Sequence, residues 1–257
     1  MSLTATFDPI LSRVRLAGTG LTGAATAVFE RSVNGVYWVV VRGGSGVAVN
    51  GSDEASLDDY EFVPGVINYY RATAGATSFT DDITPAQSGV WFKSITRPFL
   101  NRAVDVTGHS NITRAGRNGV FEVRGRSAPV AVTEVRGSRR WTCTVKCLTV
   151  TDADALELVF ASGDPLFVQT DGVHDIPGGY VIIDDVTRTR FGHLTGRRYF
   201  ELPMIEVAAP AADIVGVTST WETLIAEFGS WTAVLAEFGS WSAVLEHVSD
   251  PSVVIVP

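Results

Sequence analysis

The stretch from Asp81 to Arg102, DDITPAQSGVWFKSITRPFLNR, separates two blocks of sequence that both read as β-structure. Pro85 and Pro98 lack a backbone N–H donor and favour extended geometry in the residue before them, so the stretch predicts an ordered connection. Its large apolar residues, among them Trp91 and Phe99, need a surface to bury against. We therefore expect residues 86–101 to form a strap between two domains, and a simple buried linker is the plain alternative.

Residues 1–85 predict a small β-sandwich. Asn34-Gly35 separates the β-prone runs Ala27–Val33 and Val36–Arg42, and Asn-Gly is a strong hairpin signal because both turn positions need positive φ. No helical period separates the short strands, which is typical of a sandwich. Further strands are expected at Arg13–Leu16, Val47–Val49, Asp59–Val63 and Asn68–Thr73.

The run Gly18–Gly23, GTGLTG, has the glycine spacing of a dinucleotide-binding loop. That site requires a helix to begin at the glycines and an acidic residue about 20 positions later. Neither is present, because the chain enters the Asn34-Gly35 hairpin and Tyr37–Val41 contains no carboxylate. The run is predicted to be a loop between strands.

Residues 102–210 predict a second β-domain with one helix. Asn118-Gly119 indicates a hairpin leading into Val120–Arg124, and Trp141–Thr149 alternates as a long strand. A helix is expected at Ala153–Ala161, with Leu156, Val159 and Phe160 on one apolar face. The simplest assembly is one helix on an antiparallel sheet or half-open barrel. Cys143 and Cys147 share the long strand roughly 13 Å apart, too far for a disulfide, and are expected to be buried thiols.

The charge of the chain is unevenly distributed. Between Arg102 and Lys146 there are nine basic and three acidic residues, so this segment carries +6 and the remainder −14. In a head-to-tail assembly such a segment could face acids such as Asp53, Glu54, Asp58 and Asp59; the alternative is a solvated strand face. Three arginines, Arg136, Arg139 and Arg140, are the candidate contact residues.

Several classes of function are disfavoured by the sequence. A net charge of −8 argues against nucleic-acid binding, because such proteins neutralise phosphates with a basic surface. No secretory leader is evident, and the longest apolar run, Val36–Val41, is far shorter than a membrane-spanning helix, so no membrane insertion is expected. Common catalytic and metal-binding motifs are missing from the sequence, and no catalytic residue, cofactor or metal is predicted.

Residues 211–257 contain a ten-residue repeat that begins at Trp221, Trp231 and Trp241. Ten residues fall about 80° short of three helical turns, so one straight helix would rotate the apolar stripe from copy to copy. Glycines and serines at the copy boundaries instead suit helix ends and N-caps, which predicts short helices joined by kinks. Their anchors would be buried on their own chain or on a neighbour: Trp221, Phe228, Trp231, Phe238 and Trp241.

Gly89–Lys93 followed by Arg97–Arg102 resembles the joint in minor tail proteins of long-tailed phages that infect actinobacteria, and the order of later segments is similar up to the tryptophan repeat. In addition, Phe62–Gly65 followed by Tyr69–Ala72 resembles a turn and aromatic strand of fibronectin type III domains. The resemblance implies a virion structural protein of the tail tip, made in the host cytoplasm, that forms a ring, trimer or hexamer with itself and contacts other tail proteins.

The sequence thus predicts a mainly β protein without enzymatic activity. The expected order is a fibronectin-like sandwich (1–85), a strap (86–101), a ring-assembly β-domain with one helix (102–210) and a helical tryptophan-repeat tail (211–257). A host-surface or carbohydrate-binding module is the first alternative function. A hydrolase whose site the sequence does not reveal is the second.

Overall fold

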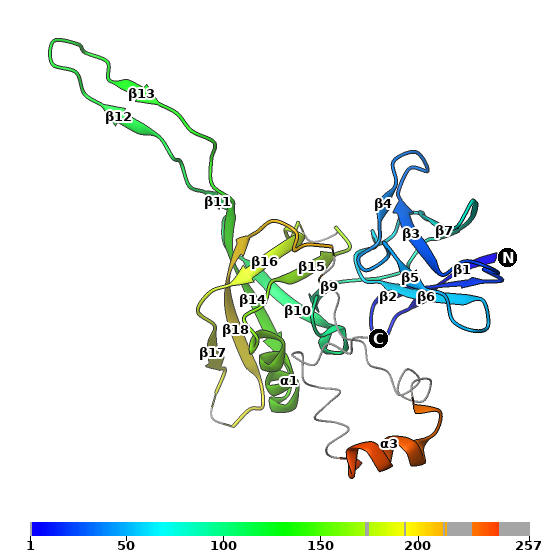
Figure 1. The fold of residues 1–257 in the computed structure, drawn as a ribbon. Helices are drawn as coiled ribbons and strands as arrows, with labels where there is room; N and C mark the ends of the chain where they lie inside the picture. Colours follow the sequence, from blue (N-terminus) through cyan, green and yellow to red (C-terminus); the bar gives the residue numbers. More distant parts are fainter. Residues whose placement is uncertain (1, 173–174, 193, 213, 215–227, 242–257) are drawn as a thin grey trace. The chain divides into compact units, whose positions relative to one another are not determined.

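The computed structural model describes residues 2–172, 175–192, 194–212, 214 and 228–241, and it is mainly β (Figure 1). The chain divides into two compact units. The described residues within Met1–Gln87, Lys93–Arg102 and Ala211–Pro257 make up the first, and Ser88–Phe92 with Ala103–Pro210 the second. The segment expected to be a strap is therefore shared between the units: it contains strand β9 (Val90–Ser94) and the short 3-10 helix η1 (Pro98–Leu100).

The first unit is a β-sandwich. One sheet has the strand order β1-β2-β6, and the other has the order β4-β3-β7-β8, with β5 also paired to β3. Alternate residues of both sheets, such as Leu16 on one and Phe29 and Tyr70 on the other, point into a common core. The strands are β1 (Ser2–Asp8), β2 (Arg13–Thr19), β3 (Thr26–Ser32), β4 (Val39–Val40), β5 (Val47–Ala48), β6 (Glu54–Asp59), β7 (Asn68–Ala74) and β8 (Thr77–Ile83).

Two local expectations for the sandwich need correction. The β3–β4 hairpin forms, but its loop spans residues 33–38 because the Asn34 side chain accepts hydrogen bonds from the backbone amides of Val36 and Tyr37. The strand expected at Asp59–Val63 is wrong. Strand β6 ends at Asp59, whose carboxylate accepts the amide of Glu61 and turns the chain. Of the Gly18–Gly23 run, Gly18 and Thr19 end β2, and the residues from Gly20 lie in the loop that joins β2 to β3.

The second unit contains a closed barrel rather than a half-open one. Its strands follow the order β14-β10-β9-β15-β16-β18, and the pairing of β14 with β18 closes the ring. Strands β11 and β17 are attached beside it. The remaining strands of this sheet are β10 (Arg102–His109), β11 (Thr113–Arg114), β14 (Arg139–Cys147), β15 (Leu166–Thr170), β16 (Gly179–Ile183), β17 (Thr187–Arg190) and β18 (Arg198–Glu206).

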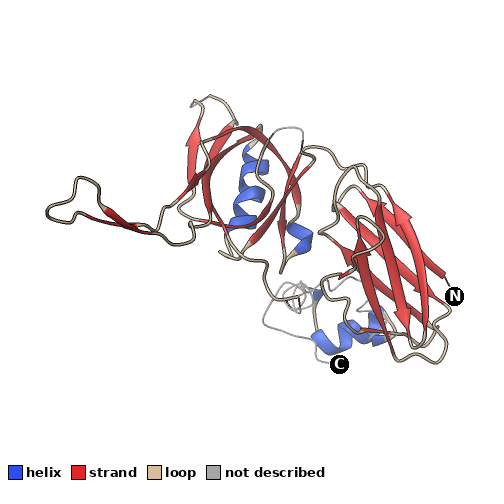
Figure 2. Ribbon diagram, turned by 90° about the horizontal axis from the view of Figure 1, so that it is seen from above, coloured by secondary structure: helices blue, strands red, loops and turns tan. Residues whose placement is uncertain are grey.

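Helix α1 (Val150–Phe160) covers one end of the barrel. Figure 2 views the ring of strands with α1 inside its outline, and Figure 1 places α1 below the strands. The helix starts earlier than expected because the Thr149 side chain accepts the amide of Asp152 as its N-cap. Its apolar face is as predicted: Leu156 and Val159 are buried, and the ring of Phe160 lies 6.1 Å from that of Phe200.

Strand β14 supplies alternate side chains to the barrel interior, from Trp141 to Cys147. Cys143 and Cys147 are both buried on this strand, as the sequence predicted. Burial raises the pKa of the Cys143 thiol to about 12, so this cysteine is a packing residue rather than a nucleophile.

Candidate interaction surfaces

A β-hairpin of residues 115–137, here called the arm, stands away from the barrel. At its base β11 pairs with β14, and the carbonyl of Ala115 accepts the amide of Gly137 at 2.9 Å. Beyond this point the two chains continue as β12 (Gly119–Phe121) and β13 (Val130–Val132), which extend away from the barrel in both views (Figures 1 and 2). The arm therefore has no layer of its own unit packed on either face.

Both faces of the arm carry apolar side chains. Phe121 pairs with Val130, and Val120 with Ala131, so successive pairs lie on opposite faces of the hairpin. Phe121 is 59% exposed, and a Cβ at Gly119 would lie 2.9 Å from its ring, so the glycine leaves room for the phenylalanine. A two-stranded hairpin is only marginally stable in water without a covering layer. The arm consequently has the character of a surface that another molecule covers.

The arm is basic, whereas the chain as a whole is acidic. It contains four arginines and two glutamates, a net charge of +2 in a chain of −8: Arg117, Glu122, Arg124, Arg126, Glu134 and Arg136. Arg117 lies 3.7 Å from Glu134 across the hairpin. Among the residues that the structure describes, the other three arginines form no ion pair. These positive charges are available to an acidic partner.

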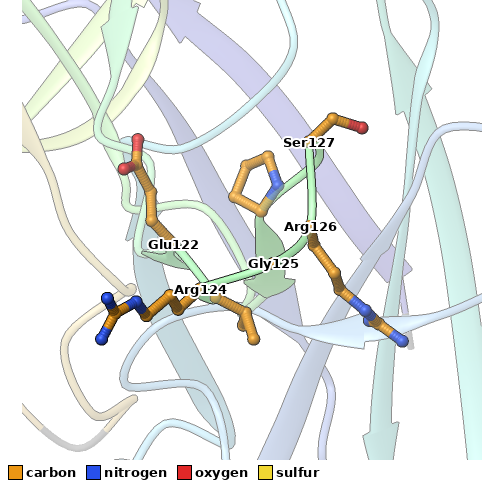
Figure 3. Close-up of a pocket in the computed structure, with 7 residues that line it drawn as sticks. Glu122, Arg124, Gly125, Arg126 and Ser127 are labelled. Atoms are coloured by element: carbon orange, nitrogen blue, oxygen red, sulfur yellow. The ribbon is translucent and has the colours of Figure 1, made fainter.

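The tip of the arm turns at residues 122–129 and not at Asn118-Gly119, where the sequence predicted the turn, because Gly119 begins strand β12. The amide of Arg126 donates to the carbonyl of Val123, and Gly125 takes φ +89°. Figure 3 shows Glu122, Arg124 and Arg126 pointing in three different directions around this turn. Because the charged groups diverge, the tip suits contact with a broad surface better than capture of a small ligand.

The three predicted contact arginines have different roles. Arg139 donates to the Glu206 carboxylate at 2.7 Å and to the carbonyl of Gly178, so it ties β14 to neighbouring strands of its own barrel. The hydrogen bond that Arg139 donates to Glu206 raises the pKa of Arg139, and the same bond lowers the pKa of Glu206. Arg136 at the base of the arm and Arg140 on β14 are exposed. Of the three predicted arginines, Arg136 and Arg140 therefore remain candidates for contact with a partner, and Arg139 does not.

The apolar residues at the joint are not all buried as expected. Phe92 is buried in the second unit, and Trp91 is half-buried with its indole N–H donating to the carbonyl of Ser88. Phe99, by contrast, is 56% exposed on η1. The three-residue 3-10 turn that begins at Pro98 presents the Phe99 ring outward, so this residue stays a candidate contact.

The tryptophan repeat is described for its second copy. Helix α3 (Trp231–Phe238) has Ser230 as its N-cap, and the Ser230 hydroxyl accepts a hydrogen bond from the amide of Ala233. Its C-cap is Gly239, which takes φ +73°. These are the serine cap and the left-handed glycine end that the sequence predicted for this copy. Phe228 is half-buried just before the helix. Trp221 and the side chain of Phe238 lie outside what the structure describes.

The turn at Gly239 brings two tryptophans of the repeat together. The ring centroids of Trp231 and Trp241 are 5.7 Å apart, with their planes at 60°. In a straight helix the same ten residues would rise about 15 Å along the axis. The two rings are 37% and 45% exposed, while Val234 on the same helix is fully buried. The indoles thus form a tilted, partly exposed pair, and both tryptophans stay candidate anchor residues.

We expect Gly239→Ala to weaken the contact between Trp231 and Trp241. An L-residue in the left-handed conformation costs about 1–2 kcal/mol, so the kink would relax toward a longer helix and separate the rings. Near-ultraviolet circular dichroism should show a weaker indole signal. Glu237→Ala, an exposed substitution in the last turn, is the matched control and should leave the signal unchanged. An unaltered signal in Gly239→Ala would contradict the role given to the kink.

Sequence reasoning missed a buried polar cluster in the sandwich. Asp59 is 2% exposed. Both of its carboxylate oxygens accept hydrogen bonds from one guanidinium nitrogen of Arg31, at 2.7 and 2.8 Å. One of these oxygens also accepts a hydrogen bond from the Tyr70 hydroxyl at 2.8 Å. Burial first, and then the neighbouring Asp59 charge, raise the pKa of Tyr70. Asp58 forms a 2.6 Å ion pair with Arg13. Both Asp58 and Asp59 therefore bind arginines of their own sandwich, and neither is the acidic contact residue that the charge pattern suggested.

Lys93 on β9 lies next to this cluster and is almost fully buried. Its ammonium donates to the backbone carbonyls of Ser12 and Tyr60 and lies 4.5 Å from the centre of the Phe62 ring. Burial lowers the pKa of Lys93 to about 7, although the charges of Asp59 and Glu61 oppose the shift. Arg31 adds to the lowering. A lysine in a sequence gives no local signal of such burial, because only the packed sandwich creates it.

We expect the sandwich to become more stable between pH 7 and pH 9 because of Lys93. Its folded pKa of about 7 lies below the ordinary value of 10.5, so the unfolded chain binds more protons throughout this range. The free energy of unfolding should then rise by up to about 1.4 kcal/mol per pH unit. Hydrogen–deuterium exchange of sandwich peptides at increasing urea concentration, repeated at several pH values, measures this free energy of unfolding.

Lys93→Met, which keeps the length and apolar character of the stem, should remove most of this slope. The exposed residue Asp82 provides the control, since Asp82→Asn should leave the slope as in the wild type. An equal slope in Lys93→Met and wild type would show that another group titrates.

Comparison of the sequence with protein-family models and with curated proteins gave no match. Within the described parts of the chain, no cluster of three or more His, Cys, Asp or Glu side chains is arranged to hold a metal ion. The described helices are all too short or too polar to cross a membrane. The exposed features described above are the arm, Phe99 and the tryptophan pair.

Proposed function

We propose that this chain is a non-enzymatic structural protein of a bacteriophage tail, a minor tail protein of the tail tip that assembles with itself and with other tail proteins. The observation that carries the assembly is the arm, whose apolar side chains are exposed on both faces and three of whose four arginines form no ion pair among the described residues. The assignment to a phage tail rests on the ordered resemblance of the joint and later segments to minor tail proteins of actinobacterial phages. In this proposal the sandwich is a fibronectin-like docking or spacer module.

Two further features support a role in assembly. Phe99 and the pair Trp231 and Trp241 expose aromatic surface, and aromatic residues are enriched at the anchoring points of protein interfaces. The tryptophan planes meet at 60°, a packed pair rather than two coplanar platforms on which a sugar ring could stack. This geometry favours the repeat as a protein-docking tail over a carbohydrate-binding surface.

A mass measurement tests the proposal. The purified full-length chain should show a concentration-dependent mass of several copies by light scattering, and ionic strength should weaken the association because it involves arginines. Purified particles of the virus that encodes the chain should contain it at a fixed copy number relative to other tail proteins. A chain that stays monomeric at its highest soluble concentration and is missing from particles would overturn the proposal.

A further inference from the structure

A small hollow in the second unit combines an apolar lining with acidic residues, and so complements the apolar and basic tip of the arm. It is lined by four apolar side chains with two acidic residues among them: Phe160, Leu166, Ile183, Val186, Asp164 and Asp184. The lining comes from the end of α1, from β15 with the loop before it, and from β16 with the loop after it. Apolar lining beside two carboxylates suits a small apolar anchor that carries neighbouring positive charge.

The tip of the arm presents such an anchor. Val123 is exposed, and it is followed by Arg124 and Arg126, which diverge from the turn (Figure 3). From Ala115 to Gly125 an extended chain spans roughly 35 Å, so the tip can reach well across a neighbouring molecule. A valine side chain matches a small apolar hollow better than the bulkier Phe121, whose ring already lies against Gly119.

We propose that the arm of one copy inserts Val123 into the hollow of a second copy, with Arg124 and Arg126 facing Asp184 and Asp164. This inference rests on the proposed self-assembly and names its contact. The arm cannot fill its own hollow, because it extends away from the barrel that carries the hollow (Figures 1 and 2). Pairing of two arms is disfavoured, since each carries +2.

The contact is head-to-tail, because the arm and the hollow are different surfaces of one chain. Such heterologous contacts close into a ring when the rotation between copies permits it. The charges also correspond: the arm is +2 and the rest of the chain is −10. In a closed ring each copy would insert its arm into one neighbour and receive the arm of the other neighbour.

Engineered cysteines test the contact directly. A protein carrying Val123→Cys is mixed with one carrying Val186→Cys under mild oxidation, and a disulfide-linked dimer of the two should form faster than either linked homodimer. The native Cys143 and Cys147 are buried and do not compete. A mixture of Val135→Cys with Val186→Cys is the control, because Val135 is exposed near the base of the arm and should cross-link little.

Charge reversal provides a second, independent test of the contact. Asp164→Arg with Asp184→Arg should weaken assembly roughly tenfold or more, and so should Arg124→Asp with Arg126→Asp. A mixture of the two reversed proteins should regain association. The unaltered arm of one protein then meets the unaltered hollow of the other, and the reversed arm meets the reversed hollow, so both contacts pair opposite charges. Circular dichroism confirms that each variant is folded.

The outcomes separate this inference from the proposed function. If the wild type assembles while the cysteine pair fails to link and the reversals leave its mass unchanged, the arm docks elsewhere and this inference is wrong. If it assembles only after other tail proteins are added, the arm's partner is not a second copy, and the inference is equally wrong. If the wild type never assembles at all, the proposed self-association itself fails.

Discussion

Removing the arm is expected to convert the assembling chain into a folded monomer. A variant in which an Asn-Gly turn replaces residues 117–135 keeps the Ala115–Gly137 hydrogen bond at the base, so the barrel should close as before. The arm exposes six large apolar side chains: Val120, Phe121, Val123, Val130, Val132 and Val135. A buried anchor typically contributes about 2 kcal/mol or more to an interface, so two such anchors correspond to roughly a thousandfold in association.

Light scattering measures the mass of this variant, and far-ultraviolet circular dichroism and thermal unfolding report its fold. The matched control is a deletion in the sandwich loop, with residues 34–37 shortened, because that loop is also exposed and lies in the other unit. The control should assemble like the wild type. An arm-deleted chain that still assembles would remove the observation on which the proposed assembly rests.

Replacing Asp59 with alanine is expected to destabilise the sandwich by about 3 to 5 kcal/mol. The substitution leaves the Arg31 guanidinium without its counter-charge and takes the acceptor from the buried Tyr70 hydroxyl. Breaking one partner of a buried ion pair typically costs this much, because the remaining charge stays in a medium of low polarity. Urea unfolding, monitored by hydrogen–deuterium exchange of sandwich peptides, measures the loss in free energy of unfolding.

Two companion variants make the result specific. Asp82→Ala, an exposed aspartate on β8, should change the stability by no more than about 0.5 kcal/mol. Tyr70→Phe removes a single hydrogen bond to Asp59 and should cost about 1 to 2 kcal/mol. A loss below 1 kcal/mol in Asp59→Ala would mean that water replaces the carboxylate and that the cluster does not hold the two sheets together.

Sequence analysis found most of the structure that short-range interactions create. The β-rich composition and the buried cysteines of β14 follow from strand periodicity, and the helix of the second unit follows from its apolar face. In the tail, the cap by Ser230 and the left-handed Gly239 were readable because each depends on contacts within one helical turn. The Asn34-Gly35 turn was also found, although the side chain of Asn34 made its loop wider than two residues.

Tertiary structure alone decided the features that join distant segments. The closure of the barrel depends on pairing β14 with β18, which are about fifty residues apart, and nothing local selects that partner among many strands. The same pairing brings Glu206 to Arg139 and removes this arginine from the candidate contact surface. The arm, in turn, continues past the turn predicted at Asn118-Gly119, because Gly119 begins strand β12.

The sequence by itself therefore determined a mainly β chain, its helix of the second unit, its buried thiols, and the serine cap and left-handed glycine of α3. Only the tertiary structure decided that the barrel is closed, that Asp59 and Lys93 are buried, and that the arm stands uncovered. The physical reason is the range of the interactions. Caps, turns and periodicity depend on residues within a few positions, whereas burial and ion pairing depend on which remote strands meet, and that choice minimises the free energy of the whole chain.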